Sequence, residues 1–567
     1  IKERSHLEKG ELSGIAKGKN LVVIQVESLQ NFVMGLEYNN QEITPNLNKL
    51  VEDSSTIYFD KFYQMIGKGN TSDAEFSTNN SLYPSMTGPS YGDYEQNNFN
   101  GLPWLLRDEG YTAWAFHGYK KDFWNRNNAY KAQGFQKFIS EDDFNVKKED
   151  IIGFGLNDEK FLNMSVDYIK ELDSIDDNPF YAFLITLTSH NPYKMPDSEE
   201  YLKIEDKYKD TILGDYFQSI YYTDKQIGNF IDRLKEEGLY DNTVFAIYGD
   251  HFGISAAHED YKVIMDDFLE EEYTLEEMQN IPLLIHIPNE DINQTVSKVS
   301  SHLDFLPTIA NLMDLDLSDS LIFGRDILNY KDTNYVATQT YMIKGSFISD
   351  NEVFIMSRDG VFSNSTVYDI NTKSKLNTDD YREIYEKLTS EINMCDYILK
   401  NNLYNEILSG KYDFNIKNDI LLDEYIYKDD GNLDYIKDVD NKKSFVIDVW
   451  YNEETSEFIF GNDTDIYTFT DLIQSNENPN TVLRFDNLDF ERVRRLFTNI
   501  LRYTRENDKD ALTGLYPIAR TFDEYHYLKT LGHEPIADIL AMNLSPEQLE
   551  DFINNLDLKI ALVNDYK

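Results

Sequence analysis

Short apolar runs alternate with amphipathic stretches along about the first 400 residues of the chain. The runs are rich in β-branched and aromatic residues, which predicts strands, and residues 215–237 carry apolar side chains at helical spacing. This alternation predicts an α/β sheet with mainly parallel strands, whose chemistry gathers at the carboxyl ends of the strands. The predicted strands are residues 20–27, 110–116, 180–186, 243–248 and 281–287.

Residues 403–442 are acidic and lose this periodicity, which indicates a linker or peripheral segment. The alternation then resumes, so we expect a main domain at 1–402 and a smaller β/α domain at 443–567. The later predicted strands are 444–450, 481–485, 512–518, 535–541 and 559–563, and the later predicted helices are 490–505, 522–531 and 546–556.

The charge of the chain limits its partners. The 53 Lys and Arg residues face 101 Asp and Glu residues, which gives a net charge of −48. Such a surface repels nucleic acids and anionic headgroups at long range, although a local pocket can still bind an anion. An aromatic content of 14% argues against a disordered acidic chain. The single cysteine, Cys395, excludes an intramolecular disulfide and a thiolate zinc site.

No apolar run approaches the ~20 residues that span a bilayer. The chain begins at Ile1 rather than at Met, so we expect a mature or trimmed piece of a longer protein.

Glu27 ends the first predicted strand, where it is either a solvated terminal residue or a ligand. The second candidate site is the turn Gly67-Lys-Gly-Asn-Thr71, which leads into a predicted helix. Ser72 and Glu75 have capping-box spacing, and the free N–H groups of this helix start favour an anion. Thr71 is either a nucleophile or, like Ser72, a helix cap.

Asp250 and His251 end another predicted strand, between Gly249 and Gly253. Adjacent strand residues point to opposite faces, so both reach one ion only if the backbone bends, which we expect the glycines to permit. A carboxylate and an imidazole suit Mn²⁺, Mg²⁺ or Zn²⁺. We favour metal ligation over a purely structural role here.

A set of cationic and aromatic residues completes the candidates. Arg126 suggests phosphate binding, because a guanidinium binds phosphate oxygens in pairs. Near it in the sequence are His117 and Trp124, and His190 follows another strand. His286 is expected in the core, whereas the roles of His258 and His302 stay open.

These passages together resemble the lipoteichoic acid synthase family, phosphoglycerol transferases of the sulfatase/alkaline-phosphatase superfamily. The resemblance covers about residues 19–402 and implies an alkaline-phosphatase/sulfatase-like sandwich with a central, mostly parallel sheet. The Cys/Ser-x-Pro-x-Arg sequence that sulfatases use is absent around Thr71. The passages that carry the resemblance are VIQVESLQNF, GKGNTSDAEF, HGYKKDFWNR, LITLTSHNPY, GLYDNTVFAIYGDHFGIS and DFLPTIANLMDLD.

The resemblance implies a role for each candidate. One divalent metal ion, Mn²⁺ first and Mg²⁺ as the alternative, would be coordinated by Glu27, Thr71, Asp250 and His251. The glycerol-phosphate pocket would be lined by His117, Trp124, Arg126, His190 and Ser255. The catalytic residues would be Thr71, His117, His190 and Arg126.

The implied activity moves glycerol phosphate from phosphatidylglycerol to a growing lipoteichoic acid chain, a poly(glycerol phosphate) on a membrane glycolipid, through a covalent intermediate on Thr71. The protein would work at the extracellular face of a Gram-positive membrane, anchored by a membrane region that this chain lacks. The alternatives are a phosphodiesterase or phosphatase, a lipoteichoic acid primase of the same fold, and a wall-polymer binding protein with a relict site.

The last 125 or so residues faintly resemble a glycerophosphodiester phosphodiesterase. Where that family has a Glu-x-Asp pair, this chain has Val446-Ile-Asp448, and Asn462-Asp463 stands in place of His-Asp. We therefore expect a degenerate accessory module there, or a plain structural β/α domain.

Overall fold

The computed structural model describes residues 4–7, 9–358 and 362–409, followed by separate segments of the C-terminal part, chiefly strands. It divides into two compact units. Unit 1 comprises residues 1–355, 366–377 and 383–412, and unit 2 comprises 356–365, 378–382 and 413–567. The expected linker at 403–442 falls largely outside the described residues, which include α12 (Tyr404–Leu408) and β18 (Tyr425–Tyr427) of this segment.

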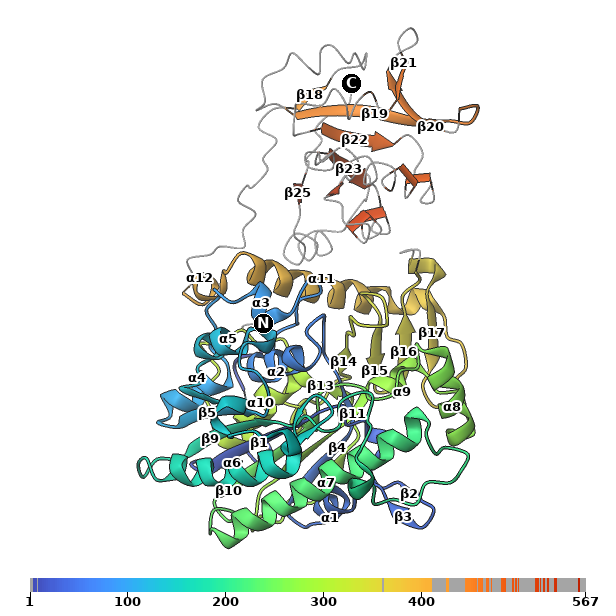
Figure 1. Cartoon of the computed structure of the whole chain (residues 1–567). Helices are drawn as coiled ribbons and strands as arrows, with labels where there is room; N and C mark the ends of the chain where they lie inside the picture. Colours follow the sequence, from blue (N-terminus) through green and yellow to red (C-terminus); the bar gives the residue numbers. More distant parts are fainter. Residues whose placement is uncertain are drawn as a thin grey trace. The chain divides into compact units, whose positions relative to one another are not determined.

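A nine-stranded sheet forms the centre of unit 1 (Figure 1). β11 is antiparallel to β10 and β4, and the other pairs are parallel, as the strand–helix alternation predicts. All five strands predicted in this part of the chain are present, whereas β4 and the short strands β6, β12 and β13 were not predicted. The order is β12 (Gln294–Val296), β4 (Thr56–Tyr63), β11 (Asn280–His286), β10 (Thr243–Gly249), β1 (Asn20–Val26), β9 (Phe180–Ile185), β5 (Thr112–His117) and β6 (Lys137–Ile139), with β13 (Ser300–Ser301) beside β4.

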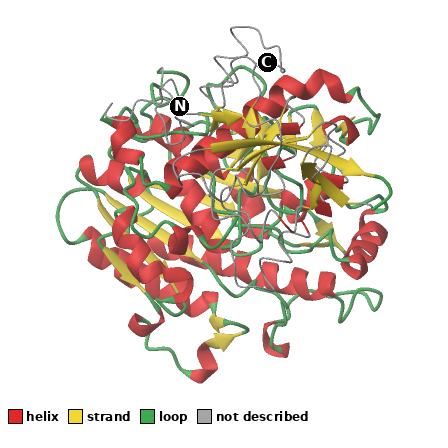
Figure 2. Ribbon diagram, turned by 90° about the horizontal axis from the view of Figure 1, so that it is seen from above, coloured by secondary structure: helices red, strands yellow, loops and turns green. Residues whose placement is uncertain are grey.

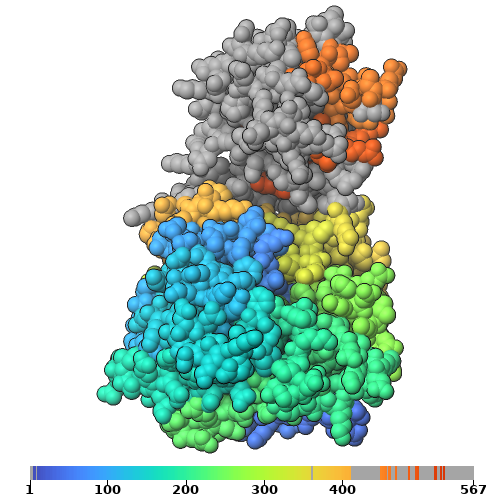
Figure 3. Space-filling view, viewed as in Figure 1, coloured from blue at the N-terminus to red at the C-terminus, as the bar shows by residue number. Residues whose placement is uncertain are grey.

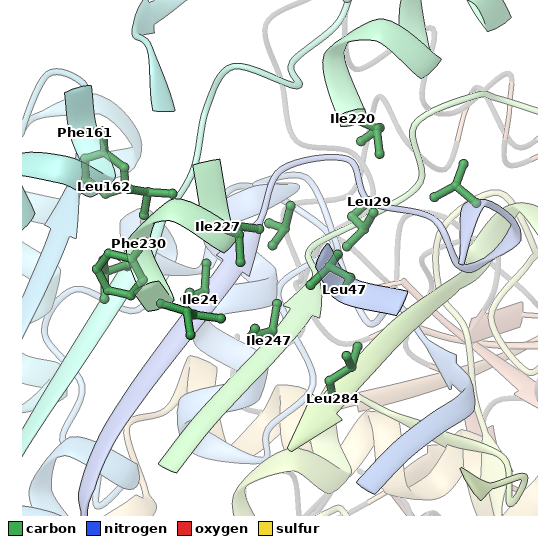
Figure 4. Close-up of a cluster of buried hydrophobic side chains, with 14 of the residues drawn as sticks. Ile24, Leu29, Leu47, Phe161, Leu162, Ile220, Ile227, Phe230, Ile247 and Leu284 are labelled. Carbon is green, nitrogen blue, oxygen red and sulfur yellow. The ribbon is translucent and has the colours of Figure 1, made fainter. Parts of the chain in front are cut away.

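Helices cover both faces of this sheet (Figure 2). Every residue of β1 is buried, which explains its continuous apolar run. On one face, Ile24 packs in the core beneath α7 (Ile212–Glu236), which corresponds to the helix predicted at 215–237 (Figure 4). On the other face lie α2 (Thr71–Asn80) and α10 (His302–Met313), where Phe305 of α10 packs on Tyr248.

The remaining elements of unit 1 surround this centre, and on the face drawn in Figure 3 segments distant in sequence, blue and yellow, lie next to each other. Among the described residues, no helix combines the length and apolarity needed to cross a bilayer. The helices are α1 (Pro45–Val51), α3 (Ser90–Asp93), α4 (Leu102–Asp108), α5 (Arg126–Gln133), α6 (Asp158–Asp173), α8 (Glu259–Leu269), α9 (Leu275–Gln279) and α11 (Arg382–Lys400). The smaller sheets are β2 (Glu37–Tyr38) with β3 (Gln41–Glu42), β7 (Ile151–Ile152) with β8 (Gly155–Leu156), and β14 (Tyr335–Val336), β15 (Phe347–Ser349), β16 (Glu352–Ile355) and β17 (Thr366–Asp369).

Unit 2 has its own sheet, and most of its strands run parallel to one another. Each of these parallel strands pairs with the one that follows it in the sequence. The side chain of Asp448, residues 462–463 and most of the predicted helices lie outside the described residues. The degenerate phosphodiesterase module therefore stays a prediction. Besides β18, the strands are β19 (Ser444–Asn452), β20 (Glu457–Gly461), β21 (Ile466–Thr468), β22 (Thr481–Phe485), β23 (Leu515–Ala519), β24 (Ile536–Ala537) and β25 (Lys559–Ile560).

Candidate active site

Four predicted metal ligands meet at the carboxyl edge of the sheet. Glu27 follows β1, and Asp250 and His251 follow β10, its parallel neighbour. Ligand atoms of these three residues all lie within 4.8 Å of one another. Thr71, the first residue of α2, places its Oγ 3.3 Å from Glu27 Oε2.

The contacts within this cluster leave a gap suited to a cation. His251 Nε2 lies 3.4 Å from Glu27 Oε1 and 3.5 Å from Asp250 Oδ2. The Oδ2 atom of Asp250 is buried and has no hydrogen-bond partner among the described residues. Its other oxygen accepts from the backbone N–H groups of Ser28, at 2.7 Å, and His251, at 2.7 Å, which fixes the carboxylate in place.

The electrostatics of the cluster also favour a cation. Burial, together with the neighbouring Glu27 carboxylate, raises the pKa of Asp250 well above its usual range. A divalent ion would offset this cost, because two carboxylates, an imidazole and a hydroxyl are ligands that Mn²⁺ and Mg²⁺ accept. The residues present therefore fit the expected metal.

The flanking glycines act differently from the expectation. Neither Gly249 nor Gly253 has a left-handed φ. A Cβ at Gly249 would lie 2.0 Å from the carbonyl oxygen of Leu29, and a Cβ at Gly253 would lie 2.3 Å from the ring of Tyr216. These glycines permit close packing between segments rather than an unusual backbone bend.

The predicted capping box at the start of α2 is wrong. Asn70 is the N-cap residue, with a φ of 41°, and Ser72 Oγ donates to the carbonyl of Gly69. Asp73 instead holds the turn, because it accepts from the backbone N–H groups of Gly67, at 3.0 Å, and Gly69, at 2.7 Å.

Glu75 forms a buried ion pair with Arg126 rather than a cap. The Nη2 of Arg126 donates to Glu75 Oε1 at 2.6 Å, and the hydroxyl of Tyr130 donates to Oε2 at 2.7 Å. The side chain of Arg126 is 1% exposed, and within the part of the chain that the structure describes its Nη1 has no hydrogen-bond partner. Arg126 lines the pocket described below, so Nη1 is a donor available to an anion.

Three histidines of the site share one feature, a contact between Nδ1 and a backbone carbonyl. The Nδ1 atoms of His117, His190 and His251 lie 3.1, 2.8 and 2.9 Å from the backbone carbonyls of Ile185, Asn191 and Phe252. A carbonyl only accepts, so Nδ1 carries the proton and Nε2 of the neutral ring carries a lone pair. Burial, with a smaller effect from Arg126, lowers the pKa of His117 well below its usual value.

All predicted site residues except Asp250 line one cavity of about 280 Å³, and Asp250 lies against it through His251. Ser28, Asn70, Trp124 and Tyr193 line the same cavity with positive φ angles of 41–64°. Such strained residues concentrate at functional sites. The roles assigned to the individual residues remain predictions.

Sequence reasoning missed Gln25 and Gln64, which hold these loops, and left the role of His302 open. Gln25 Nε2 donates to the carbonyl of Thr71 at 3.1 Å, and Gln64 Oε1 accepts from the N–H of Phe252 at 2.8 Å. Buried His302 accepts the N–H of Met65 at Nδ1, at 3.1 Å, and its Nε2 lies 3.2 Å from the carbonyl of Gly249. The only sequence signal for these residues was polarity beside apolar runs.

Comparisons with known proteins agree with this architecture. A model of the protein family described as Sulfatase matches residues 19–315. A solved structure, the lipoteichoic acid synthase LtaP from Listeria monocytogenes, has a TM-score of 0.64 and 29% sequence identity, and the match covers 70% of this chain and 97% of that chain. The alkaline-phosphatase/sulfatase-like fold is therefore confirmed.

Curated relatives match about 70% of the chain. Lipoteichoic acid synthase 2 of Bacillus subtilis (strain 168) is 34% identical over 393 residues, which cover 69% of this chain and 58% of the relative. The lipoteichoic acid synthase of Staphylococcus aureus (strain USA300) is 31% identical over 410 residues, 71% of this chain and 60% of the relative. The chain thus spans about three fifths of the length of these relatives.

Proposed function

Because the chain belongs to the sulfatase family and is similar to lipoteichoic acid synthases, we propose that it is a metal-dependent phosphoglycerol transferase. Its donor is phosphatidylglycerol, and its acceptor is a growing poly(glycerol phosphate) chain on a membrane glycolipid. One observation carries the proposal: Thr71 Oγ lies beside the Glu27 carboxylate in the pocket that Arg126 also lines.

Glu27, Thr71, Asp250 and His251 would hold one divalent ion, Mn²⁺ or Mg²⁺. Such an ion, when bound, supplies positive charge that favours ionisation of the Thr71 hydroxyl and offsets charge on the phosphoryl oxygens. Gln25 fixes the nucleophile from behind through the carbonyl of Thr71. This contact holds the backbone of Thr71, and the contact of Oγ with Glu27 Oε2 orients the hydroxyl, which together reduce the entropy lost on reaching the transition state.

Arg126 binds a non-bridging phosphoryl oxygen through Nη1. Glu75 neutralises the guanidinium and directs it, because it occupies Nε, at 3.0 Å, and Nη2. The charge on the phosphoryl oxygens increases towards the transition state, so a donor fixed in a buried site stabilises the transition state more than the bound substrate.

The transfer proceeds in two displacements at phosphorus. In the first, a bond forms between Thr71 Oγ and phosphorus while the bond from phosphorus to the diacylglycerol oxygen breaks, and diacylglycerol leaves with a proton. In the second, the terminal hydroxyl of the polymer loses its proton and attacks phosphorus, and Thr71 Oγ leaves. One phosphate ester bond replaces another, and no proton is gained or lost over the cycle.

His190 is the proton carrier best suited to these steps. It lies at the partly exposed side of the pocket, with Nδ1 at the Asn191 carbonyl and Nε2 available for a proton. His117 is buried and its pKa is strongly lowered by that burial, so it stays neutral and accepts a hydrogen bond through Nε2. Trp124 and Ser255 complete the walls that face the glycerol.

The same proposal places the domain at the outer face of a Gram-positive cell membrane, anchored through another part of the parent protein. The proposal assigns unit 2, described chiefly in its strands, the role of an accessory module.

The test is transfer from radiolabelled phosphatidylglycerol in the presence of Mn²⁺. Thr71→Ala is expected to lower the rate by a factor of roughly 10³ or more, because the nucleophile is removed. Thr71→Ser keeps a hydroxyl and serves as the matched control, with measurable transfer and with label trapped on the protein, detected by mass spectrometry. Unchanged polymer synthesis by Thr71→Ala would refute the proposal.

Product analysis separates this function from hydrolysis. A transferase gives labelled polymer, whereas a phosphodiesterase gives free glycerol phosphate. If free glycerol phosphate is the main product even with acceptor glycolipid present, the chain is a hydrolase of the same fold.

A further inference from the structure

Four aromatic side chains surround the mouth of the active-site pocket. Tyr119 lies 5.2 Å from both Phe123 and Phe154, measured between ring centroids, and Phe123 lies 5.1 Å from Trp124. All four line the pocket. We call Tyr119, Phe123, Trp124 and Phe154 the aromatic rim.

Two residues of the aromatic rim are exposed, whereas Tyr119 and Trp124 are half-buried. Phe123 is 37% exposed and Phe154 is 45% exposed, and Phe154 lies in the turn of the β7–β8 hairpin. Ile151 of the same hairpin is 48% exposed. Single exposed apolar residues are ordinary, but Phe123 and Phe154 line one pocket and Ile151 lies in the same hairpin as Phe154, so together they indicate a binding surface.

The charge along the pocket changes from the inner end to the rim. Among the described residues that line the pocket, Glu27 is the only carboxylate, in a chain with 101 Asp and Glu residues. The inner end offers Arg126 and the metal ligands to an anion, and the mouth offers aromatic rings. This arrangement matches a molecule with a phosphodiester at one end and an apolar body at the other.

We propose that the aromatic rim and Ile151 enter the interface of a lipid bilayer and contact the acyl-glycerol part of a phospholipid whose phosphodiester reaches Arg126. The choice of phosphatidylglycerol as that lipid rests on the function proposed above. The rim then lets the enzyme bind its donor without extracting the whole lipid into water.

Three observations favour a bilayer over a carbohydrate as the occupant. A sugar needs an open ring face, whereas one face of Phe154 is covered by His190, stacked with centroids 4.7 Å apart and planes at 20°. Tyr119 and Phe123 meet edge to face, at 85°. Ile151 has no ring to offer to a sugar, but it partitions into an apolar phase.

The net charge gives the interaction a distinctive salt dependence. A chain of charge −48 is repelled by anionic vesicles at long range. Salt screens this repulsion but does not weaken apolar contacts. Binding through the rim should therefore strengthen as salt increases, whereas binding through basic residues would weaken.

The experiment measures flotation of the full chain with vesicles of phosphatidylglycerol and phosphatidylcholine. Ile151→Ser and Ile175→Ser form a matched pair, because Ile175 is 51% exposed but lies between α6 and β9, at the amino end of that strand. We expect Ile151→Ser to lower the vesicle partition coefficient roughly threefold and Phe154→Ser roughly tenfold, with Ile175→Ser unchanged. Equal binding by all three variants and the wild type would overturn the inference.

A second measurement reports how deeply Trp124 enters the bilayer. Phosphatidylglycerol brominated on its acyl chains should quench tryptophan fluorescence in the wild type and less so in Trp124→Phe. Concentration-dependent dimers that Phe154→Ser abolishes would instead assign the rim to a second copy. Binding of the soluble glycolipid headgroup alone, lost in the same variant, would assign it to a sugar, and either result would overturn the inference.

The outcome is separable from that of the proposed function. Thr71→Ala keeps the rim and should float as the wild type does. If Ile151→Ser and Phe154→Ser bind vesicles normally while Thr71→Ala loses transfer, the rim inference fails and the transferase stands. If Ile151→Ser and Phe154→Ser lose vesicle binding but the wild type makes no polymer, the transferase proposal fails and the rim inference stands.

Discussion

Arg126, at the inner end of the pocket, is 1% exposed and shares Glu75 with Tyr130, whereas Phe154, at the mouth, is 45% exposed and packs on other rings. The inner end is a network of buried charges, each oriented by named hydrogen bonds. The rim is a set of side chains whose apolar surface faces solvent. Chemistry needs fixed polar groups, and recognition of a fluid ligand needs only apolar area. Substitutions at the two regions should therefore differ in kind.

The largest effect on stability is expected at the ion pair between Glu75 and Arg126. Glu75→Leu leaves the guanidinium buried without a counter-charge, and we expect the free energy of unfolding to fall by about 3–5 kcal/mol. Chemical denaturation monitored by circular dichroism measures this change. Phe154→Ser, the comparison at the rim, should change the same quantity by less than about 0.5 kcal/mol.

A double variant sharpens this prediction. Glu75→Leu/Arg126→Met removes both charges, so it should regain most of the lost stability while transfer stays abolished, because the phosphate donor is gone. If the double variant is no more stable than Glu75→Leu alone, then lost packing rather than an unpaired charge explains the effect.

The sequence predicted the inner end better than the rim, for a physical reason. Glu27, Asp250 and His251 follow buried parallel strands, and the carboxyl ends of such strands meet at one edge, so local patterns locate the cluster. Glu75 instead pairs with a residue 51 positions away, and local spacing suggested a helix cap. Phe123 and Phe154 come together only through the β7–β8 hairpin, which no periodic pattern marks.

Strands were predictable from the sequence where they are buried along their whole length. β1, β9 and β10 are buried along their whole length, so their apolar runs are continuous. β4 was missed because Asp60 and Lys61 interrupt its apolar residues where the strand is only partly buried. The expected role of the glycines was wrong at Gly249, since only the fold shows that the carbonyl of Leu29 lies against it.

A buried histidine remote from the pocket separates stability from chemistry. His286 lies in β11 between the hydroxyls of Thr56, at 2.9 Å, and Tyr240, at 2.7 Å. Burial lowers its pKa from 6.5 to about 4, opposed weakly by Asp53. As the pH falls from about 6.5 towards 4, the unfolded chain binds a proton that the folded chain does not, so stability falls by about 2 kcal/mol at pH 5.

His286→Gln removes this titration. Its free energy of unfolding should change about 2 kcal/mol less between pH 7 and pH 5 than that of the wild type, in denaturation curves at both pH values. Transfer activity at pH 7 should be retained, because His286 does not line the pocket. Parallel pH profiles for the two proteins would show that His286 does not remain neutral in the folded chain.

The smallest of these effects is expected at His302, which is also buried but joins two segments of the site. It links Met65, before the nucleophile turn, to Gly249, before the metal ligand Asp250. His302→Leu breaks both links and should weaken Mn²⁺ binding roughly tenfold, as loss of outer-shell support does, measured by titration calorimetry. His302→Gln can still accept from one segment and donate to the other, so it should restore most of the affinity. If His302→Gln binds Mn²⁺ as weakly as His302→Leu, ring packing against Phe62 rather than the two hydrogen bonds aligns the segments.

Vesicle binding should stay at the wild-type level in both His302 variants, because the rim does not depend on this link. A parallel loss of vesicle binding and Mn²⁺ binding would show that the inner end and the rim are coupled.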